Sequence, residues 1–456
     1  MTFNSLEYAA FLPVVVVLYW LLPRRRQNWL VLVASYLFYG AFDWRFLGLL
    51  VLSTVLDFWF ARSLRAAPAG RRRRWLVASL VVNLGILAAF KYVDFFLESA
   101  IDLLGTLGVE ANPSFLRVVL PVGISFYTFH GISYVFDVYR GDVEPADDLL
   151  DYACFVAFFP QLVAGPIGRA HLQLPQFERE RTRPDGDAFR SALALILLGL
   201  VKKVAIADAV APVANAAFGD PGLSGTTSLA LGALAFAIQI YGDFSGYSDI
   251  ARGSARLLGI ELPANFRQPY LSTSITEFWQ RWHVSLSNWL RDYLYVPLGG
   301  NRRGRVATYR NLLVTMALGG LWHGARWTFV LWGVGHGLLL AIHRWWRERH
   351  DEDAARLPAV VRGLGTFALV TGLWILFRSP SVDIARGYAR GLVSWRSGVV
   401  NLDDVAIVVL AAIAVVVVDV LERRRATVHP LAVAAGVLAV VIWSGGSPVP
   451  FIYFQF

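Results

Sequence analysis

The chain contains very little cysteine and few charged residues, and both shortages narrow the kind of protein it can be. Cys154 is its only cysteine, so no disulfide can form within the chain and a cysteine-based metal site is not expected. Inside the segment DYACFVAFF, this thiol is expected to pack as a small apolar group rather than to act as a nucleophile. Charged residues make up only 16% of the 456 residues while 56% are hydrophobic, which excludes an ordinary soluble protein.

Long apolar runs recur from one end of the chain to the other, and the mean hydropathy is +0.51. The runs are continuous rather than alternating, which favours membrane-spanning helices over a β-barrel. We therefore expect an all-α, polytopic integral membrane protein with about 10–12 transmembrane helices. The runs leave no room for a soluble domain, and no internal repeat is visible. One membrane-embedded domain is predicted over residues 1–456, with its catalytic core at about 114–345.

Positive charge exceeds negative charge, with 42 Lys and Arg against 33 Asp and Glu, but the basic residues gather in clusters between the apolar runs. That arrangement is typical of cytoplasmic membrane loops, so nucleic acid is not expected as a partner. Placing the clusters at 24–26, 71–74 and 302–305 on the cytoplasmic side puts both termini outside. The first apolar run has no small-residue cleavage site after it and is interpreted as a retained helix.

Three segments do not have the pattern of a simple membrane span. Residues 151–168 are interrupted by two prolines, and we expect a re-entrant segment there. Lys202 and Lys203 interrupt the apolar run 189–211, so either that helix starts later or it lies along the interface with its lysines reaching the headgroups. The section 265–300 mixes aromatic, charged and apolar residues, and is expected to form interfacial or re-entrant helices around a central cavity.

Two short stretches place a tryptophan–histidine pair in apolar surroundings: EFWQRWHVSLS, which contains His283, and GGLWHGA, which contains His323. An ionisable side chain at membrane depth is costly, so each histidine is a candidate functional residue. Imidazole can take a proton from an attacking hydroxyl near neutral pH. About thirteen residues into its helix, at ~1.5 Å per residue, His323 is expected deep in the ~30 Å hydrocarbon layer and away from helix ends. The structural alternative is a buried or interfacial histidine without chemistry.

The two stretches also carry a resemblance to a known family. Residues 278–303, with RWHVSLS and RDYLYVPLGGNRRG, resemble the signature of the membrane-bound O-acyltransferases, and GLWHGARW at 320–327 resembles the active-site histidine motif of that family. Four other segments agree: PVGISFYTF at 121–129, PQLVAGPI at 160–167, DFSGYSDIA at 243–251 and PFIYFQF at 450–456. Their order is that of the branch that includes alginate O-acetyltransferase and the D-alanyl transferase of teichoic acid.

The resemblance implies a catalytic role for His323 and places His283 in the same site, where it would orient the acyl donor or share the proton. No GxSxG nucleophile elbow is visible, so direct transfer with His323 as general base is expected rather than a covalent acyl-enzyme. For the polar residues at 243–249, two interpretations are equally good: helix capping at the interface, or lining for a hydroxyl-rich acceptor or the donor channel. No histidines are spaced as H-x-x-x-H, so a metal site is not expected. Further candidates for holding the donor or the acceptor are Trp279, Trp282, Asn288, Trp322, Asp243 and Tyr247.

The resemblance also implies an activity. An acyl group, expected to be acetyl, would pass from a cytoplasmic thioester donor, either acetyl-CoA or an acyl-carrier thioester, to a hydroxyl of an extracytoplasmic glycan or polyol. No bound cofactor is expected. A secreted or membrane-anchored partner protein is implied, and the location would be the inner (plasma) membrane of a bacterium. The rival interpretation is a transporter or flippase, for which intramembrane ionisable residues are equally typical, but which predicts an internal repeat.

Overall fold

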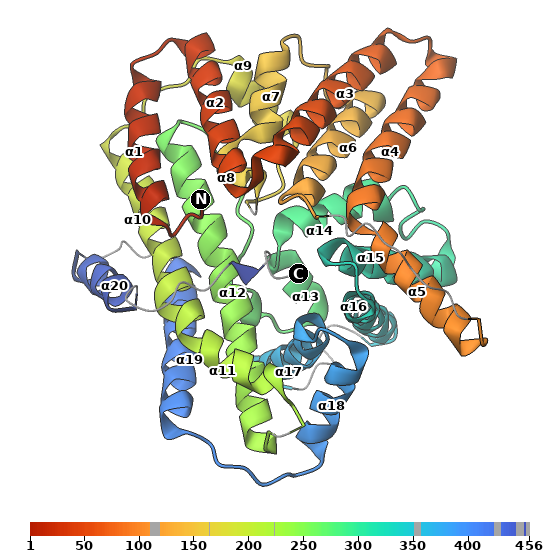
Figure 1. Ribbon diagram of the computed structural model, residues 1–456, viewed down its shortest axis with the longest axis vertical. Helices are drawn as coiled ribbons and strands as arrows, with labels where there is room; N and C mark the ends of the chain where they lie inside the picture. Colours follow the sequence, from red (N-terminus) through yellow and green to blue (C-terminus); the bar gives the residue numbers. More distant parts are fainter. Residues whose placement is uncertain are drawn as a thin grey trace. The chain divides into compact units, whose positions relative to one another are not determined.

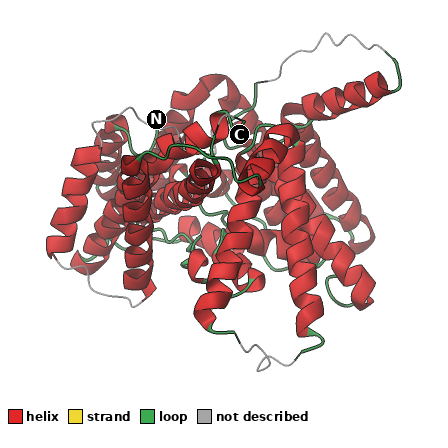
Figure 2. Cartoon of the chain, turned by 90° about the horizontal axis from the view of Figure 1, so that it is seen from below, coloured by secondary structure: helices red, strands yellow, loops and turns green. Residues whose placement is uncertain are grey.

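Helices make up all the regular structure that can be described in this protein. The computed structural model describes residues 1–109, 119–163, 165–222, 224–350, 357–423, 430–443 and 451–452. Within these ranges no strand occurs, which confirms the predicted all-α class (Figure 2). The chain is a polytopic membrane protein, and five described helical stretches are long and apolar enough to cross a membrane: Arg24–Ala66, Ala69–Lys91, Thr226–Leu257, Ala359–Arg378 and Leu402–Arg423.

The chain divides into two compact units that are interleaved in sequence. Unit 1 comprises Met1–Ala192 and Ser254–Pro263, and unit 2 comprises Leu193–Gly253 and Ala264–Phe456. Two helices, α10 (Gly186–Leu200) and α12 (Thr226–Leu257), contribute residues to both units. The helices wholly in unit 1 are α1 (Leu6–Trp20), α2 (Arg24–Asp43), η1 (Trp44–Phe46), α3 (Leu47–Ala66), α4 (Ala69–Lys91), α5 (Val93–Thr106), α6 (Ile124–Arg140), α7 (Leu149–Ala157), α8 (Phe159–Leu162) and α9 (Ala170–Glu178).

In unit 1, α3, α4 and α6 run side by side, and α2 packs against α7 (Figure 1). A buried hydrogen bond joins two of these helices: the Asn83 amide on α4 donates to Asp57 Oδ1 on α3 at 2.6 Å. The predicted break within residues 151–168 is confirmed, since α7 ends at Ala157 and α8 begins at Phe159 with Pro160 in its first turn. Proline is well placed there because the first turn of a helix leaves its N–H groups unpaired in any case.

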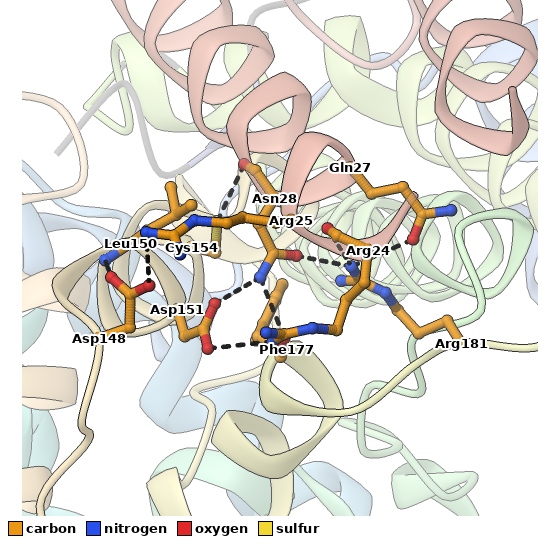
Figure 3. Close-up of polar contacts among 10 residues, drawn as sticks. All are labelled: Arg24, Arg25, Gln27, Asn28, Asp148, Leu150, Asp151, Cys154, Phe177 and Arg181. Atoms are coloured by element: carbon orange, nitrogen blue, oxygen red, sulfur yellow. Dashed lines mark hydrogen bonds and ion pairs between the residues drawn. The ribbon is translucent and has the colours of Figure 1, made fainter. Parts of the chain in front are cut away.

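The basic cluster at the start of α2 has a structural role in unit 1. Asn28 lies between Asp151 and Arg181 (Figure 3): its amide donates to Asp151 Oδ1 at 2.6 Å, and its Oδ1 accepts from Arg181 Nη2 at 2.6 Å. Arg24 donates to the other Asp151 oxygen at 3.2 Å. The Cys154 thiol is buried and donates to the Asn28 carbonyl at 3.1 Å, which fits the packing role expected for it.

Unit 2 contains the segments around both predicted active-site histidines. Its remaining elements are η2 (Val201–Ala207), α11 (Asp208–Gly219), η3 (Pro269–Leu271), α13 (Ile275–Arg281), α14 (Val284–Leu290), η4 (Arg291–Tyr295), α15 (Gly304–His323), α16 (Trp327–Arg347), α17 (Ala359–Arg378), α18 (Val382–Val393), α19 (Leu402–Arg423) and α20 (Pro430–Trp443). The section 265–300 forms several short helices rather than one span, as its mixed composition predicted. Residues 444–450 and 453–456 lie outside the described residues.

Both sequence-based interpretations of the two central lysines are wrong. The helix neither starts late nor exposes them, because α10 continues through the π-helix η2 into α11 with both side chains buried. Lys202 Nζ lies 2.7 Å from Asp249 Oδ2, and Lys203 Nζ lies 2.7 Å from Asp208 Oδ1 and 2.9 Å from Asp243 Oδ1. A buried ammonium is tolerated when carboxylates surround it. Asp243 and Asp249 come from α12, whereas Asp208 begins α11, directly after η2.

Helices α15 and α16 pack closely because glycines face the neighbouring backbone. A Cβ added at Gly333 would lie 2.1 Å from the carbonyl oxygen of Met316, and one added at Gly320 would lie 2.1 Å from that of Phe329. Small residues at helix contacts are a common way to bring membrane helices together.

We therefore expect Gly333→Ala to push α16 away from α15 and to lower the free energy of unfolding by about 1–3 kcal/mol. Thermal unfolding of the detergent-solubilised protein measures this. Gly372→Ala is the matched control, because no atom lies within 4 Å of a Cβ built there. Equal unfolding temperatures for the two variants would show that the contact at Gly333 relaxes at no cost.

Candidate active site

His283 occupies a sharp bend between two short helices. Helix α13 ends at Arg281 and α14 begins at Val284, and His283 between them has φ 42° and ψ 54°, in the left-handed region. This conformation is uncommon for a residue with a Cβ and requires support from its surroundings. Asn265 supplies it: its carbonyl oxygen accepts from Val284 N at 2.8 Å, and its side-chain oxygen accepts from Ser285 N at 3.3 Å.

The imidazole of His283 is fully buried among aromatic rings. Phe244 packs edge-on against it with centroids 4.7 Å apart, and Trp322 lies at 6.1 Å. Its Nδ1 is 3.0 Å from Asn265 Oδ1. Burial lowers the pKa of His283 to about 3, because a charged imidazolium is poorly solvated there. The ring is therefore neutral at physiological pH.

His323 is buried too, but it lies at the end of its helix and not inside it, so the expected distance from helix ends was wrong. Helix α15 ends at His323 because Gly324 is extended, with φ −168° and ψ 152°. A Cβ at Gly324 would lie 2.2 Å from the Phe329 ring, so the chain needs a glycine to turn there. The His323 ring is 6.4 Å from that of His283 and 5.2 Å from Trp332, centroid to centroid.

Among the predicted neighbours of the histidines, Trp322 lies against both, since its ring is also 5.0 Å from that of His323. Trp282 is buried and stacks on Phe278 with centroids 5.6 Å apart. The indole of Trp279 instead donates to another histidine, His336. Asn288 lies on α14 and is half-buried.

The polar residues at 243–249 are not helix caps, because they lie within the 32-residue helix α12. Asp243, besides its ion pair, accepts from the backbone N–H of Ile452 at 2.7 Å. Tyr247 stacks on Phe451 with centroids 4.1 Å apart. Asp243 and Tyr247 therefore contact Phe451 and Ile452 of the C-terminal motif. The other residues of that motif, Pro450 and 453–456, lie outside the described residues. Phe244, on the same helix, packs against His283.

Two residues in this region escaped the sequence analysis. His336, on α16, is fully buried, accepts from Trp279 Nε1 at 3.3 Å and packs edge-on against Trp332 at 4.8 Å. Its sequence signal is weak: it follows Trp332 by four residues and so shares its helix face. Nothing in the sequence indicated a role for Asn265, because only the folded structure brings it next to His283. Within the described ranges, no group of three or more His, Cys, Asp or Glu side chains is placed to hold a metal ion.

The sequence was compared with those of known proteins and protein families, and it matches one family. The profile of the membrane-bound O-acyltransferase family matches residues 146–379. A probable alginate O-acetylase of Azotobacter vinelandii is 47% identical over 83% of this chain and 75% of its own length. The peptidoglycan O-acetyltransferase of Helicobacter pylori is 36% identical over 84% and 78%, and the teichoic acid D-alanyltransferase of Streptococcus thermophilus is 28% identical over 62% and 73%.

These matches favour an enzyme over the transporter considered as the rival. They agree with the predicted family and with the branch inferred from the motifs, and both Trp–His pairs fall within residues 146–379. The chain belongs to the membrane-bound O-acyltransferase family and is an O-acyltransferase of the membrane.

Proposed function

We propose that this enzyme transfers an acetyl group from a cytoplasmic thioester donor to a hydroxyl of an extracytoplasmic polysaccharide, with His323 as general base and His283 beside it. The donor would be acetyl-CoA or an acetylated carrier protein. The acceptor class follows from the relatives, whose names refer to alginate and peptidoglycan acetylation. The proposed location is a bacterial inner membrane, with both termini outside and a secreted or membrane-anchored partner protein.

The observation that carries the proposal is the pairing of two buried imidazoles in one aromatic enclosure, with ring centroids 6.4 Å apart. In the proposed reaction His323 takes the proton of the acceptor hydroxyl, and the oxygen bonds to the thioester carbonyl carbon. The C–S bond breaks, and the departing thiolate takes the proton from the imidazolium. The base is thereby regenerated, and no covalent acyl-enzyme is required.

The surroundings of the pair suit this chemistry. Trp322, Trp332 and Phe377 pack edge-on against His323 with centroids 5.0–5.2 Å away. Such walls exclude water, which limits hydrolysis of the thioester and strengthens electrostatic interactions with the developing oxyanion. A general base must be unprotonated before it accepts a proton.

The test is acyl transfer in membranes that carry the full chain. Labelled acetyl-CoA and labelled acetyl-carrier protein are supplied in parallel, and label is followed into polysaccharide extracted from the same cells, with membranes lacking the enzyme as control. We expect label in the polysaccharide with one of the two donors. Transport of donor or polysaccharide without any labelled ester would overturn the proposal.

A further inference from the structure

We infer that Asn265 is a positioning residue that holds His283 in the tautomer with its proton on Nδ1, so that Nε2 is a proton acceptor inside the site. The inference rests on the proposed function for its consequence, since it makes Nε2 of His283 a hydrogen-bond acceptor beside His323, the proposed base. The tautomer itself follows from hydrogen bonding alone.

The atom of the Asn265 side chain that faces His283 is its amide oxygen. That atom lies 3.3 Å from the backbone nitrogen of Ser285 and 2.9 Å from its hydroxyl. A backbone N–H can only donate, so the atom it meets must be the amide oxygen and not the NH₂ group. The NH₂ group points the other way and donates to the hydroxyl of Ser248 at 3.3 Å.

The contact with this amide oxygen determines which nitrogen of the His283 imidazole carries the proton. Asn265 Oδ1 lies 3.0 Å from His283 Nδ1. A carbonyl oxygen only accepts, so Nδ1 must carry the proton in this contact. A neutral imidazole has one N–H, which leaves Nε2 with a lone pair. Nε2 is buried and has no hydrogen-bond partner among the described residues.

Asn265 is well suited to hold this arrangement because it binds three consecutive residues. Its backbone oxygen accepts from Val284, and its side-chain oxygen accepts from Ser285 while facing His283. The bend that gives His283 its left-handed conformation and the contact that sets its tautomer therefore have a common origin. A residue that fixes a ring nitrogen in this way usually also fixes the ring orientation.

His336 provides a comparison, because its Nδ1 meets a hydrogen-bond donor where His283 Nδ1 meets an acceptor. The Trp279 indole can only donate, and it donates to His336 Nδ1 at 3.3 Å. His336 is therefore protonated on Nε2 when neutral, which is also the tautomer that predominates in free histidine. Two fully buried histidines of unit 2 thus have opposite tautomers, each set by one neighbour. His336 serves as an internal reference for the experiment.

The other titratable groups on the elements around His283 do not change this assignment. Helix α15 contributes His323, and α16 contributes His336. Helix α12 contributes Asp243 and Asp249, whose carboxylates face Lys203 and Lys202 respectively. Asn265 is the side-chain hydrogen-bond partner of the His283 ring within the part of the chain that the structure describes.

Nitrogen NMR of the full-length protein, labelled with ¹⁵N-histidine in nanodiscs, tests the tautomer directly. Among the buried histidines, His130 also has an unprotonated Nε2, because that nitrogen accepts from Gly168 N at 3.0 Å. We therefore expect a second signal of this kind from His283, which His283→Gln removes. In Asn265→Leu that signal should convert to the Nε2–H form, whereas in Asn265→Asp, which retains an acceptor oxygen, it should persist. A protonated Nε2 on His283 in the wild-type protein, or an unchanged tautomer in Asn265→Leu, would overturn the inference. The wild-type spectrum decides the first point even if Asn265→Leu does not fold.

Acetyl transfer gives the second readout. We expect Asn265→Leu to lower it by on the order of 100-fold, as losses of orienting groups do elsewhere. Asn265→Asp should stay within about tenfold, and its acidic limb should move to higher pH, because a carboxylate beside Nδ1 stabilises the imidazolium and raises the pKa of His283. Asn215→Leu, at an exposed position on α11, is the matched control and should be unchanged. An unshifted profile in Asn265→Asp would count against Asn265 as the residue that sets the proton.

The two readouts separate the inference from the proposed function. If the NMR result is as expected but no acyl transfer is found, the tautomer stands and the proposed reaction fails. If transfer is found and depends on His323, but Nε2 of His283 carries a proton, the reaction stands and the inference fails.

Discussion

His323→Ala is expected to reduce acetyl transfer by about 10²- to 10⁴-fold, which is the usual contribution of a general base. The variant removes the imidazole from the end of α15 and leaves Trp322, Trp332 and Phe377 around a smaller side chain. Donor binding should change little, because the base acts on the acceptor hydroxyl. The effect is measured as initial rate of label transfer in membranes at matched enzyme levels, with the donor saturating.

The matched control for this prediction is His350→Ala. His350 is an exposed histidine that follows α16 and contacts Trp346, so its loss should leave the rate unchanged. Full activity in His323→Ala would remove His323 as the base and would leave His283 as the candidate. Loss of activity together with loss of folded protein would instead indicate a packing role, so the amount of monodisperse protein after solubilisation is measured for every variant.

Lys203→Met is expected to have the largest effect on stability, about 3–5 kcal/mol, because removing one partner of a buried ion pair leaves charge uncompensated. The Lys203 ammonium lies between Asp208 and Asp243, at 2.7 and 2.9 Å, with only 1% of its side chain exposed. Without it, two carboxylates face each other in a medium that solvates them poorly. Thermal unfolding in detergent, followed by the monodisperse fraction, measures the loss.

Two further variants separate this explanation from a general effect of substitution. Combining Lys203→Met with Asp243→Asn should recover part of the stability, because it neutralises one of the two carboxylates. Arg303→Met removes an exposed positive charge and should leave stability unchanged. If Lys203→Met is as stable as the wild-type protein, the two carboxylates do not depend on the lysine. In that case Asp243 would again be a candidate for holding the donor or the acceptor, as predicted from the sequence, in addition to its ion pair with Lys203.

Much of this protein could be predicted from the chain because its main features are local. Apolar runs specify membrane helices through their own composition, since lipid offers no partner for an unpaired backbone. The break before Pro160 could also be predicted locally, because proline lacks the N–H that a continuing helix needs. The family motifs contain His283 and His323 themselves, so both candidates were found without knowledge of any contact.

What the sequence could not specify are the contacts between residues that lie far apart in the chain. Lys202 and Lys203 looked misplaced in an apolar run, because the carboxylates of Asp243 and Asp249 that neutralise them come from another helix.

The class of the protein, its family and the two histidines could be predicted from the chain, because hydropathy and contiguous motifs are local properties. Which atoms of those histidines are available for chemistry depends on the folded structure. The proton on His283 is set by Asn265, 18 residues away, and that on His336 by Trp279, 57 residues away. Tautomers depend on the direction of a neighbour's donor or acceptor, and that direction exists only once the chain has folded.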